Sequence, residues 1–109
     1  MSDKVFFAVI GTMIEFPGAI VGMATLEPVY EGWVTRLRGH TDYEGEKGMQ
    51  KAAAFAMKTT GTIAGYRDGD VELWDVVEIW NNETAARVAG IANDQSTIYQ
   101  IETGKLVWI

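Results

Sequence analysis

The chain has 109 residues, no cysteine and a formal net charge of −6, with 48% hydrophobic and 22% charged residues. These values predict one globular domain over residues 1–109, and they exclude a disulfide framework and a disordered chain. Phosphate binding needs clustered Lys and Arg, but the basic residues here are spread among acids, so we predict no nucleic-acid partner. An acidic surface favours cationic small molecules or basic protein surfaces.

The apolar stretch from Val5 to Leu26 could suggest a membrane span or a signal sequence. Glu15 and Pro17 interrupt this stretch, its glycines weaken a helix, and the opening Met-Ser-Asp-Lys is not a basic start. We therefore predict neither a membrane span nor a membrane partner. The absence of cysteine fits a reducing compartment, so we expect a cytoplasmic location.

The first half of the chain predicts one clear strand and one clear helix. Val5 to Ile14 is apolar on both faces, which is typical of a buried central strand. Residues 19–26 fit a strand or a helix, and Tyr30 to Arg38 alternates weakly, as an edge strand does. Residues 39–48 are polar with three glycines and predict a mobile loop. The alanine-rich segment Gly48 to Lys58 has helical spacing.

The second half predicts a hairpin. Thr62 to Tyr66 is a short strand, and Asp68-Gly69 is typical of a type I′ turn, which needs positive φ twice. The returning strand, Val71 to Trp80, alternates with period two. One face carries Val71, Leu73, Asp75, Val77 and Ile79, and the other carries Glu72, Trp74, Val76, Glu78 and Trp80.

A helix capped by Asn81 or Asn82 follows the hairpin, and two closing strands lie at Thr97 to Ile101 and Lys105 to Ile109. The expected buried stripe of this helix is Ala85, Val88, Ala89 and Ala92. With residues 15–45 set aside, the order βαββαβ predicts an α+β fold, a ferredoxin-like antiparallel sheet with two helices on one face. We expect the row with Trp74, Val76 and Trp80 to lie on the other face, covered by residues 15–45 or a partner subunit.

Two residues near the hairpin turn are the first candidates for chemistry. Glu72 lies beside Trp74, and a carboxylate next to an indole is partly desolvated and holds a cation well. Tyr66 ends the preceding strand, within the expected cross-strand reach of Glu72. The alternative for both is a plain strand-end residue facing water.

Asp75 is the next candidate, because an acid in an apolar row must be paired or functional. The expected partner is Arg67 or Arg87. Glu78, with Glu72 and Trp74, would line one wall of a pocket, although alternating acids are also common on a solvated face.

The loop residues His40, Asp42, Glu44 and Glu46 do not match an EF-hand, and we predict no metal site. The single histidine leaves no nucleophilic triad. Acids, one tyrosine and tryptophans suit the binding of a flat cationic molecule, and they suit hydrolytic or covalent chemistry poorly.

The pattern resembles the small phage-encoded S-adenosylmethionine lyases, also called SAM hydrolases. The residues that carry the resemblance are the opening strand Val5 to Ile10, the segment Ala64-Gly65-Tyr66-Arg67, Glu72 before a strand, the helix segment Ala85 to Ala89 and a closing hairpin. The resemblance implies a PII-like, ferredoxin-like subunit that forms homotrimers, with substrate at the subunit junctions.

By position, Glu72 resembles the family's essential glutamate and Tyr66 its active-site tyrosine. The implied reaction needs no cofactor or metal: the substrate's carboxylate attacks its own γ-carbon, expels methylthioadenosine and leaves homoserine lactone. Such an activity would counter host methylation-dependent defence. We expect Trp74, Asp75 and Glu78 to contact the substrate.

Two other classes of function remain open. One is a non-enzymatic acidic binding protein, such as a phage inhibitor that docks on a basic host surface. The other is a ferredoxin-like enzyme of the small dimeric monooxygenase type, with its pocket between the helices and the sheet.

Overall fold

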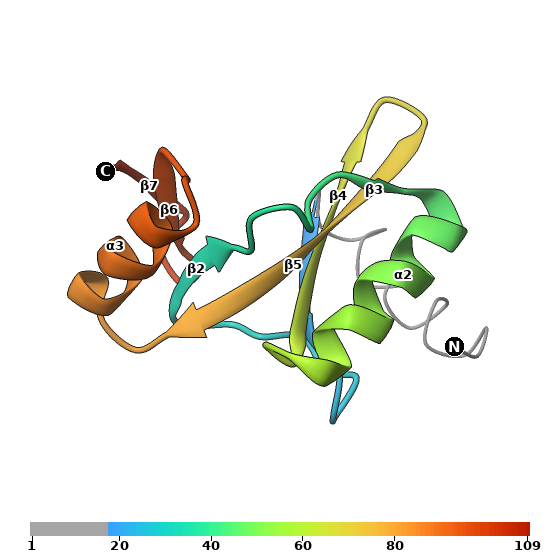
Figure 1. The fold of residues 1–109 in the computed structure, drawn as a ribbon, viewed down its shortest axis with the longest axis horizontal. Helices are drawn as coiled ribbons and strands as arrows, with labels where there is room; N and C mark the ends of the chain where they lie inside the picture. Colours follow the sequence, from blue (N-terminus) through green and yellow to red (C-terminus); the bar gives the residue numbers. More distant parts are fainter. Residues whose placement is uncertain (1–17) are drawn as a thin grey trace.

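Seven strands form one antiparallel sheet in residues 18–109, the part of the chain that the computed structural model describes (Figure 1). The strand order is β1-β4-β5-β2-β6-β7, and β3 pairs with β5 beside this path. With the two helices that the same residues contain, the architecture is α+β, as predicted. The predicted strand Val5 to Ile14 lies outside the described residues. The strands are β1 (Gly18–Gly22), β2 (Trp33–Arg36), β3 (Tyr43–Glu44), β4 (Thr62–Asp68), β5 (Val71–Trp80), β6 (Thr97–Gln100) and β7 (Lys105–Trp108).

The β4–β5 hairpin has the predicted position, and β5 has the predicted bounds. Asp68 pairs with Val71, so Gly69 and Asp70 are the two central turn residues. Only Gly69 has a positive φ, 62°. The predicted type I′ turn is therefore wrong, because that turn needs positive φ at both positions; one positive φ at the first position is the pattern of type II′.

The predicted edge position of the strand within Tyr30 to Arg38, which is β2, is wrong. Strand β2 lies inside the sheet, where Thr35 pairs with Glu78 of β5 and Val34 pairs with Tyr99 of β6. Trp33, Val34 and Thr35 are all buried. A strand on each side of β2 and the burial of three consecutive residues are what an interior strand shows.

The helix α2 (Gly45–Lys58) begins three residues earlier than predicted, so its first turn and β3 fall within the expected loop 39–48. Glu46 in the first turn is favourable at the positive end of the helix dipole. Its buried stripe consists of Met49, Ala52, Ala53 and Ala56.

The helix α3 (Glu83–Ala92) is capped by Asn82, whose side chain accepts a hydrogen bond from the Ala85 N–H at 2.8 Å. Its expected stripe is wrong: Val88 is 65% exposed, and the fully buried positions are Ala86 and Gly90. A Cβ on Gly90 would lie 2.5 Å from Ile109, so the helix approaches the sheet on its smallest residues. Neither α2 nor α3, the helices of the described residues, is long and apolar enough to cross a membrane.

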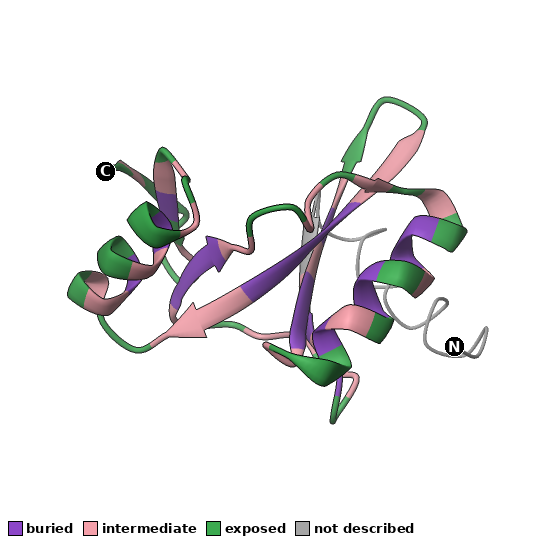
Figure 2. Cartoon of the chain, in the orientation of Figure 1, coloured by how far each residue is buried: buried purple, intermediate pink, exposed green. Residues whose placement is uncertain are grey.

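Both helices cover the same face of the sheet, where they form two apolar clusters (Figures 1 and 2). The α2 cluster includes Trp74 and Val76, and the α3 cluster includes Trp33, with Trp80 packed against it. The row with Trp74, Val76 and Trp80 therefore faces the helices, contrary to the prediction. Period-two alternation separates the two faces of a strand, but it does not say which face is the core when both rows are largely apolar.

Candidate functional site

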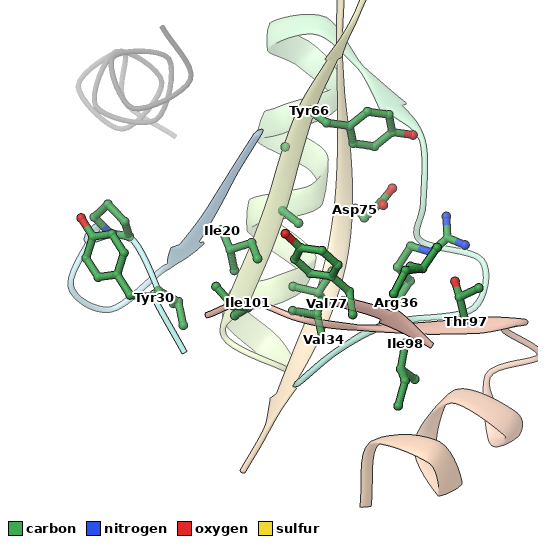
Figure 3. A pocket seen from close by; sticks show the side chains of 16 residues that line it. Ile20, Tyr30, Val34, Arg36, Tyr66, Asp75, Val77, Thr97, Ile98 and Ile101 are labelled. Carbon is green, nitrogen blue, oxygen red and sulfur yellow. The ribbon is translucent and has the colours of Figure 1, made fainter. Parts of the chain in front are cut away.

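The face of the sheet opposite the helices carries a cavity of about 740 Å³ (Figure 3). This volume lies within the range of small-molecule sites. Alternate residues of neighbouring strands project to one face, so β1, β4, β5, β2 and β6 each contribute to the cavity. Its walls are mainly apolar and include Ile20, Val34, Val77, Tyr99 and Ile101.

The polar side chains that line the cavity include Tyr66 of β4, Asp75 of β5 and Arg36 of β2, which come from adjacent strands (Figure 3). Asp42, in the loop between β2 and β3, joins two of them. The Tyr66 hydroxyl donates to Asp42 Oδ1 at 2.7 Å, and the Asp42 backbone N–H donates to Asp75 Oδ1 at 2.7 Å. Tyr66, Asp42 and Asp75 therefore form one hydrogen-bonded cluster beside the apolar wall of the cavity.

The loop that carries Asp42 is fixed to β5 and α2. The Val76 carbonyl accepts from the Leu37 N–H at 2.9 Å, and the Val76 N–H donates to the His40 carbonyl at 2.8 Å. The His40 ring stacks on Phe55 of α2 with ring centroids 3.6 Å apart. Asp42 itself has φ 59°, a left-handed conformation that aspartate tolerates better than most residues. These contacts hold its N–H and carboxylate in position.

Burial governs the ionisation of Asp75, which is only 4% exposed. Loss of water raises the pKa of this carboxyl group; the Asp42 N–H opposes that rise, the Asp42 charge adds to it, and the Arg36 guanidinium lowers it. Burial, the hydrogen bond to Asp42 and the two carboxylates together raise the pKa of Tyr66 to about 12. Tyr66 is therefore a neutral hydrogen-bond donor at neutral pH.

The structure separates the two residues expected to act together. Tyr66 pairs with Leu73, and Glu72 pairs with Arg67, so Tyr66 and Glu72 lie on opposite faces of the hairpin. A shift of one residue in register reverses the face of a side chain, and the expected cross-strand proximity is wrong for this reason. The Glu72 carboxylate instead lies 3.4 Å from the Arg67 guanidinium.

Two further sequence candidates also lie away from the cavity. Trp74 is completely buried in the α2 cluster, and Glu78 pairs with Thr35 on the helix-covered face. Glu72, Trp74 and Glu78 share one face, as the alternation predicts, but that face packs against helices.

Asp75 is the candidate that reaches the cavity with Tyr66. The prediction that Arg67 or Arg87 pairs with Asp75 is wrong. The Arg67 guanidinium instead pairs with Glu72, and the Arg87 guanidinium lies 3.6 Å from the Glu83 carboxylate within α3.

Arg36 was missed from the sequence, and Asp42 was considered only as one of four loop residues at a rejected metal site. Arg36 follows Val34 on the cavity face of an interior strand, and a charged residue there would have been conspicuous had β2 been placed inside the sheet. No sequence signal indicates the contacts of Asp42 with Tyr66 and Asp75, because they depend on a loop conformation set by contacts with β5. Within residues 18–109, no three His, Asp or Glu side chains are grouped as metal ligands.

Comparisons with protein-family models, curated proteins and solved structures find no significant match for this chain. The site offers a buried carboxylate, a guanidinium, a neutral phenol and an apolar floor, and this combination can bind a small molecule that has both a charged and an apolar part.

Proposed function

We propose that the cavity binds S-adenosylmethionine and that the protein is an S-adenosylmethionine lyase. The observation that carries the proposal is Asp75, a carboxylate 4% exposed in the wall of a mainly apolar cavity. Within residues 18–109, neither ion pair involves this carboxylate. A buried carboxylate in such a position favours a cationic ligand, because the ligand's charge compensates the lost hydration. S-adenosylmethionine combines a sulfonium and an ammonium group with a flat adenine, which suits tyrosines such as Tyr30 and Tyr99 in the same cavity.

The proposed reaction is an intramolecular displacement. An oxygen of the substrate's carboxylate forms a bond to the γ-carbon while the bond from that carbon to sulfur breaks. The electron pair of the broken bond stays on sulfur, so the products are neutral methylthioadenosine and homoserine lactone. The protein has only to fold the methionine chain into the attack geometry and to exclude water, which requires no nucleophile from the chain.

We further propose a ferredoxin-like, PII-like arrangement that starts at β2. The elements β2, α2, β4, β5, α3 and β6 follow the order βαββαβ, and their strands lie in the order β4-β5-β2-β6. This order supports the proposal, with β1 and β7 added at the two edges.

Within one chain, Glu72 cannot share a site with Tyr66, so its proposed role depends on a second subunit. In one chain it lies on the face opposite Tyr66, but it is near the tip of a hairpin that projects from the sheet (Figure 1). In a homotrimer, we propose that the hairpin of one subunit brings Glu72 to the cavity of the next. A light-scattering mass of one chain for active protein would contradict this part of the proposal.

The test is incubation of the purified protein with S-adenosylmethionine and chromatographic detection of methylthioadenosine. We expect product from the wild type and a loss of at least about tenfold in rate for Asp75→Asn and for Tyr66→Phe. Glu72→Gln tests the shared site in the same assay. Asp70→Asn is the matched control, because Asp70 is an exposed acid two residues from Glu72. No product from protein with a native circular dichroism spectrum would refute the lyase.

The alternative, a non-enzymatic acidic binding protein, has separate support. Asp68 and Asp70 at the hairpin turn, and Glu44 and Glu46 near the start of α2, are all exposed. Such a protein would lose its partner when these acids are neutralised or when salt is added, and it would tolerate Asp75→Asn. The monooxygenase class has less support, because the cavity lies on the face that the helices leave open.

A further inference from the structure

We infer that Arg36 and Asp75 form a clamp for the head group of an α-amino acid, in which Arg36 binds the carboxylate and Asp75 binds the ammonium group. The inference rests on the proposed function for the identity of the whole ligand. The chemistry of the head group comes from the cavity alone.

The positions of the two residues on the sheet set the size of the clamp. Arg36 pairs with Val77 across β2 and β5, and Asp75 lies two residues before Val77 on the same face. Arg36 and Asp75 are therefore diagonal neighbours, a relation that separates backbones by about 7–8 Å. Both side chains line the cavity (Figure 3). A group carrying one positive and one negative charge fits between them.

The two charges do not neutralise each other directly. Among residues 18–109, the ion pairs closer than 4.0 Å are Arg67–Glu72 and Arg87–Glu83, and neither includes Arg36 or Asp75. Arginine is long enough to close such a gap, and a buried carboxylate is costly to leave without a counter-ion. The open spacing is the arrangement expected when a ligand supplies both missing partners.

The hydrogen bonds around Asp75 agree with this role. The Asp42 N–H occupies Oδ1, and the second carboxylate oxygen has no hydrogen-bond partner in the described part of the chain. That oxygen can accept from an ammonium group. The Arg36 guanidinium can hold a carboxylate through one oxygen or both, and a single contact leaves the other oxygen for attack on the γ-carbon.

The clamp also predicts which molecules are rejected. Asp75, Arg36 and Tyr66 are polar, whereas Val34, Val77 and Ile20 make the cavity apolar beyond them. A ligand without the carboxylate leaves Arg36 unpaired, and a ligand without the ammonium group leaves Asp75 unpaired. Sites with buried polar groups discriminate strongly against such ligands.

The test is isothermal titration calorimetry with three probes that the proposed reaction cannot consume. Sinefungin has the complete head group and an amine carbon in place of the sulfonium. Decarboxylated S-adenosylmethionine keeps the ammonium group and lacks the attacking carboxylate. Methylthioadenosine lacks the head group altogether. Comparing these probes separates the contribution of each charge without turnover.

We expect Arg36→Met to weaken sinefungin about 30-fold and to leave the other two probes within about threefold. Asp75→Asn should weaken sinefungin and decarboxylated S-adenosylmethionine and spare methylthioadenosine. Arg36→Lys, which keeps the charge, should lose less than Arg36→Met. Arg38→Met is the matched control, because Arg38 is exposed and does not line the cavity.

The clamp is refuted if Arg36→Met binds sinefungin as Arg38→Met does, if it weakens methylthioadenosine equally, or if the wild type binds no sinefungin. The outcome is separate from that of the lyase assay. Arg36-dependent sinefungin binding without any methylthioadenosine production would support the clamp and refute the lyase. Production of methylthioadenosine with no dependence of binding on Arg36 would do the reverse.

Discussion

Replacing Gly65 with alanine should destabilise the protein, because Gly65 lies directly against the largest buried side chain. Gly65 of β4 pairs with Trp74 of β5. A Cβ at Gly65 would lie 2.2 Å from Cζ3 and 2.5 Å from Cε3 of the Trp74 ring. The ring is 0% exposed, so it cannot swing into solvent to make room.

The size of the effect follows from these distances. Carbon atoms pack at about 3.5 Å or more, so the ring or the strand has to move by about 1 Å. Overpacking of this kind costs about 1–3 kcal/mol. At about 4–8 °C per kcal/mol for a domain of this size, a loss of about 2 kcal/mol, the middle of this range, should lower the melting temperature of Gly65→Ala by about 8–16 °C relative to the wild type.

Thermal and urea unfolding followed by circular dichroism measure the loss. Gly22→Ala is the matched control: its nearest neighbour is the Thr25 hydroxyl at 3.6 Å, and it should change stability by less than about 0.5 kcal/mol. Trp74→Phe removes the ring atoms that crowd position 65. The double variant Gly65→Ala/Trp74→Phe should therefore lose about 1 kcal/mol less stability than the two single variants lose when their losses are added. Equal melting of Gly65→Ala and Gly22→Ala would refute the packing of Trp74 against β4.

Three further predictions concern single side chains. The Tyr66 phenol should ionise near pH 12 in an absorbance titration, as its raised pKa of about 12 requires, and Asp42→Asn should lower that midpoint. Because the folded value lies above the ordinary value of 10.0, the stability linked to Tyr66 should be intact below pH 10 and lost as pH rises from about 10 to 12; a midpoint of 10 would contradict this. The pKa of Asp75 is also raised, so its contribution to stability is present at acidic pH and is lost as pH rises through the folded value. Asp75→Asn should therefore unfold at a higher urea concentration than the wild type at pH 7, and this difference should shrink toward pH 4. If the variant is less stable than the wild type at pH 7, the raised pKa of Asp75 is contradicted. Asn82→Ala should cost about 1 kcal/mol by removing the α3 cap, and an unchanged urea midpoint would show that the cap contributes nothing.

Local patterns account for the elements that were predicted well. Alanine-rich spacing marked α2, Asn82 before Glu83 marked the start of α3, and alternation from Val71 to Trp80 marked β5. Each of these signals depends on residues a few positions apart, so a linear sequence contains all of it. The errors in the same elements are shifts of a few residues, as in the earlier start of α2.

Partners far apart in the sequence account for what was missed. The alternation of β5 places Asp75 and Trp74 on opposite faces, but only packing against α2 decides that Trp74 is in the core and Asp75 in the cavity. Likewise, Arg36 and Asp75 are about forty positions apart in the sequence, and they are diagonal neighbours only because β2 lies beside β5 in the sheet.

Local residue patterns are enough to indicate a hairpin, two helices and a carboxylate at position 75 that an apolar row does not explain, in an acidic chain without cysteine. Only the packed fold shows which face of the sheet is open, which charges share the cavity, and that Tyr66 and Glu72 lie on opposite faces. Backbone propensity acts over a few residues, whereas burial and register are settled only when strands and helices pack together.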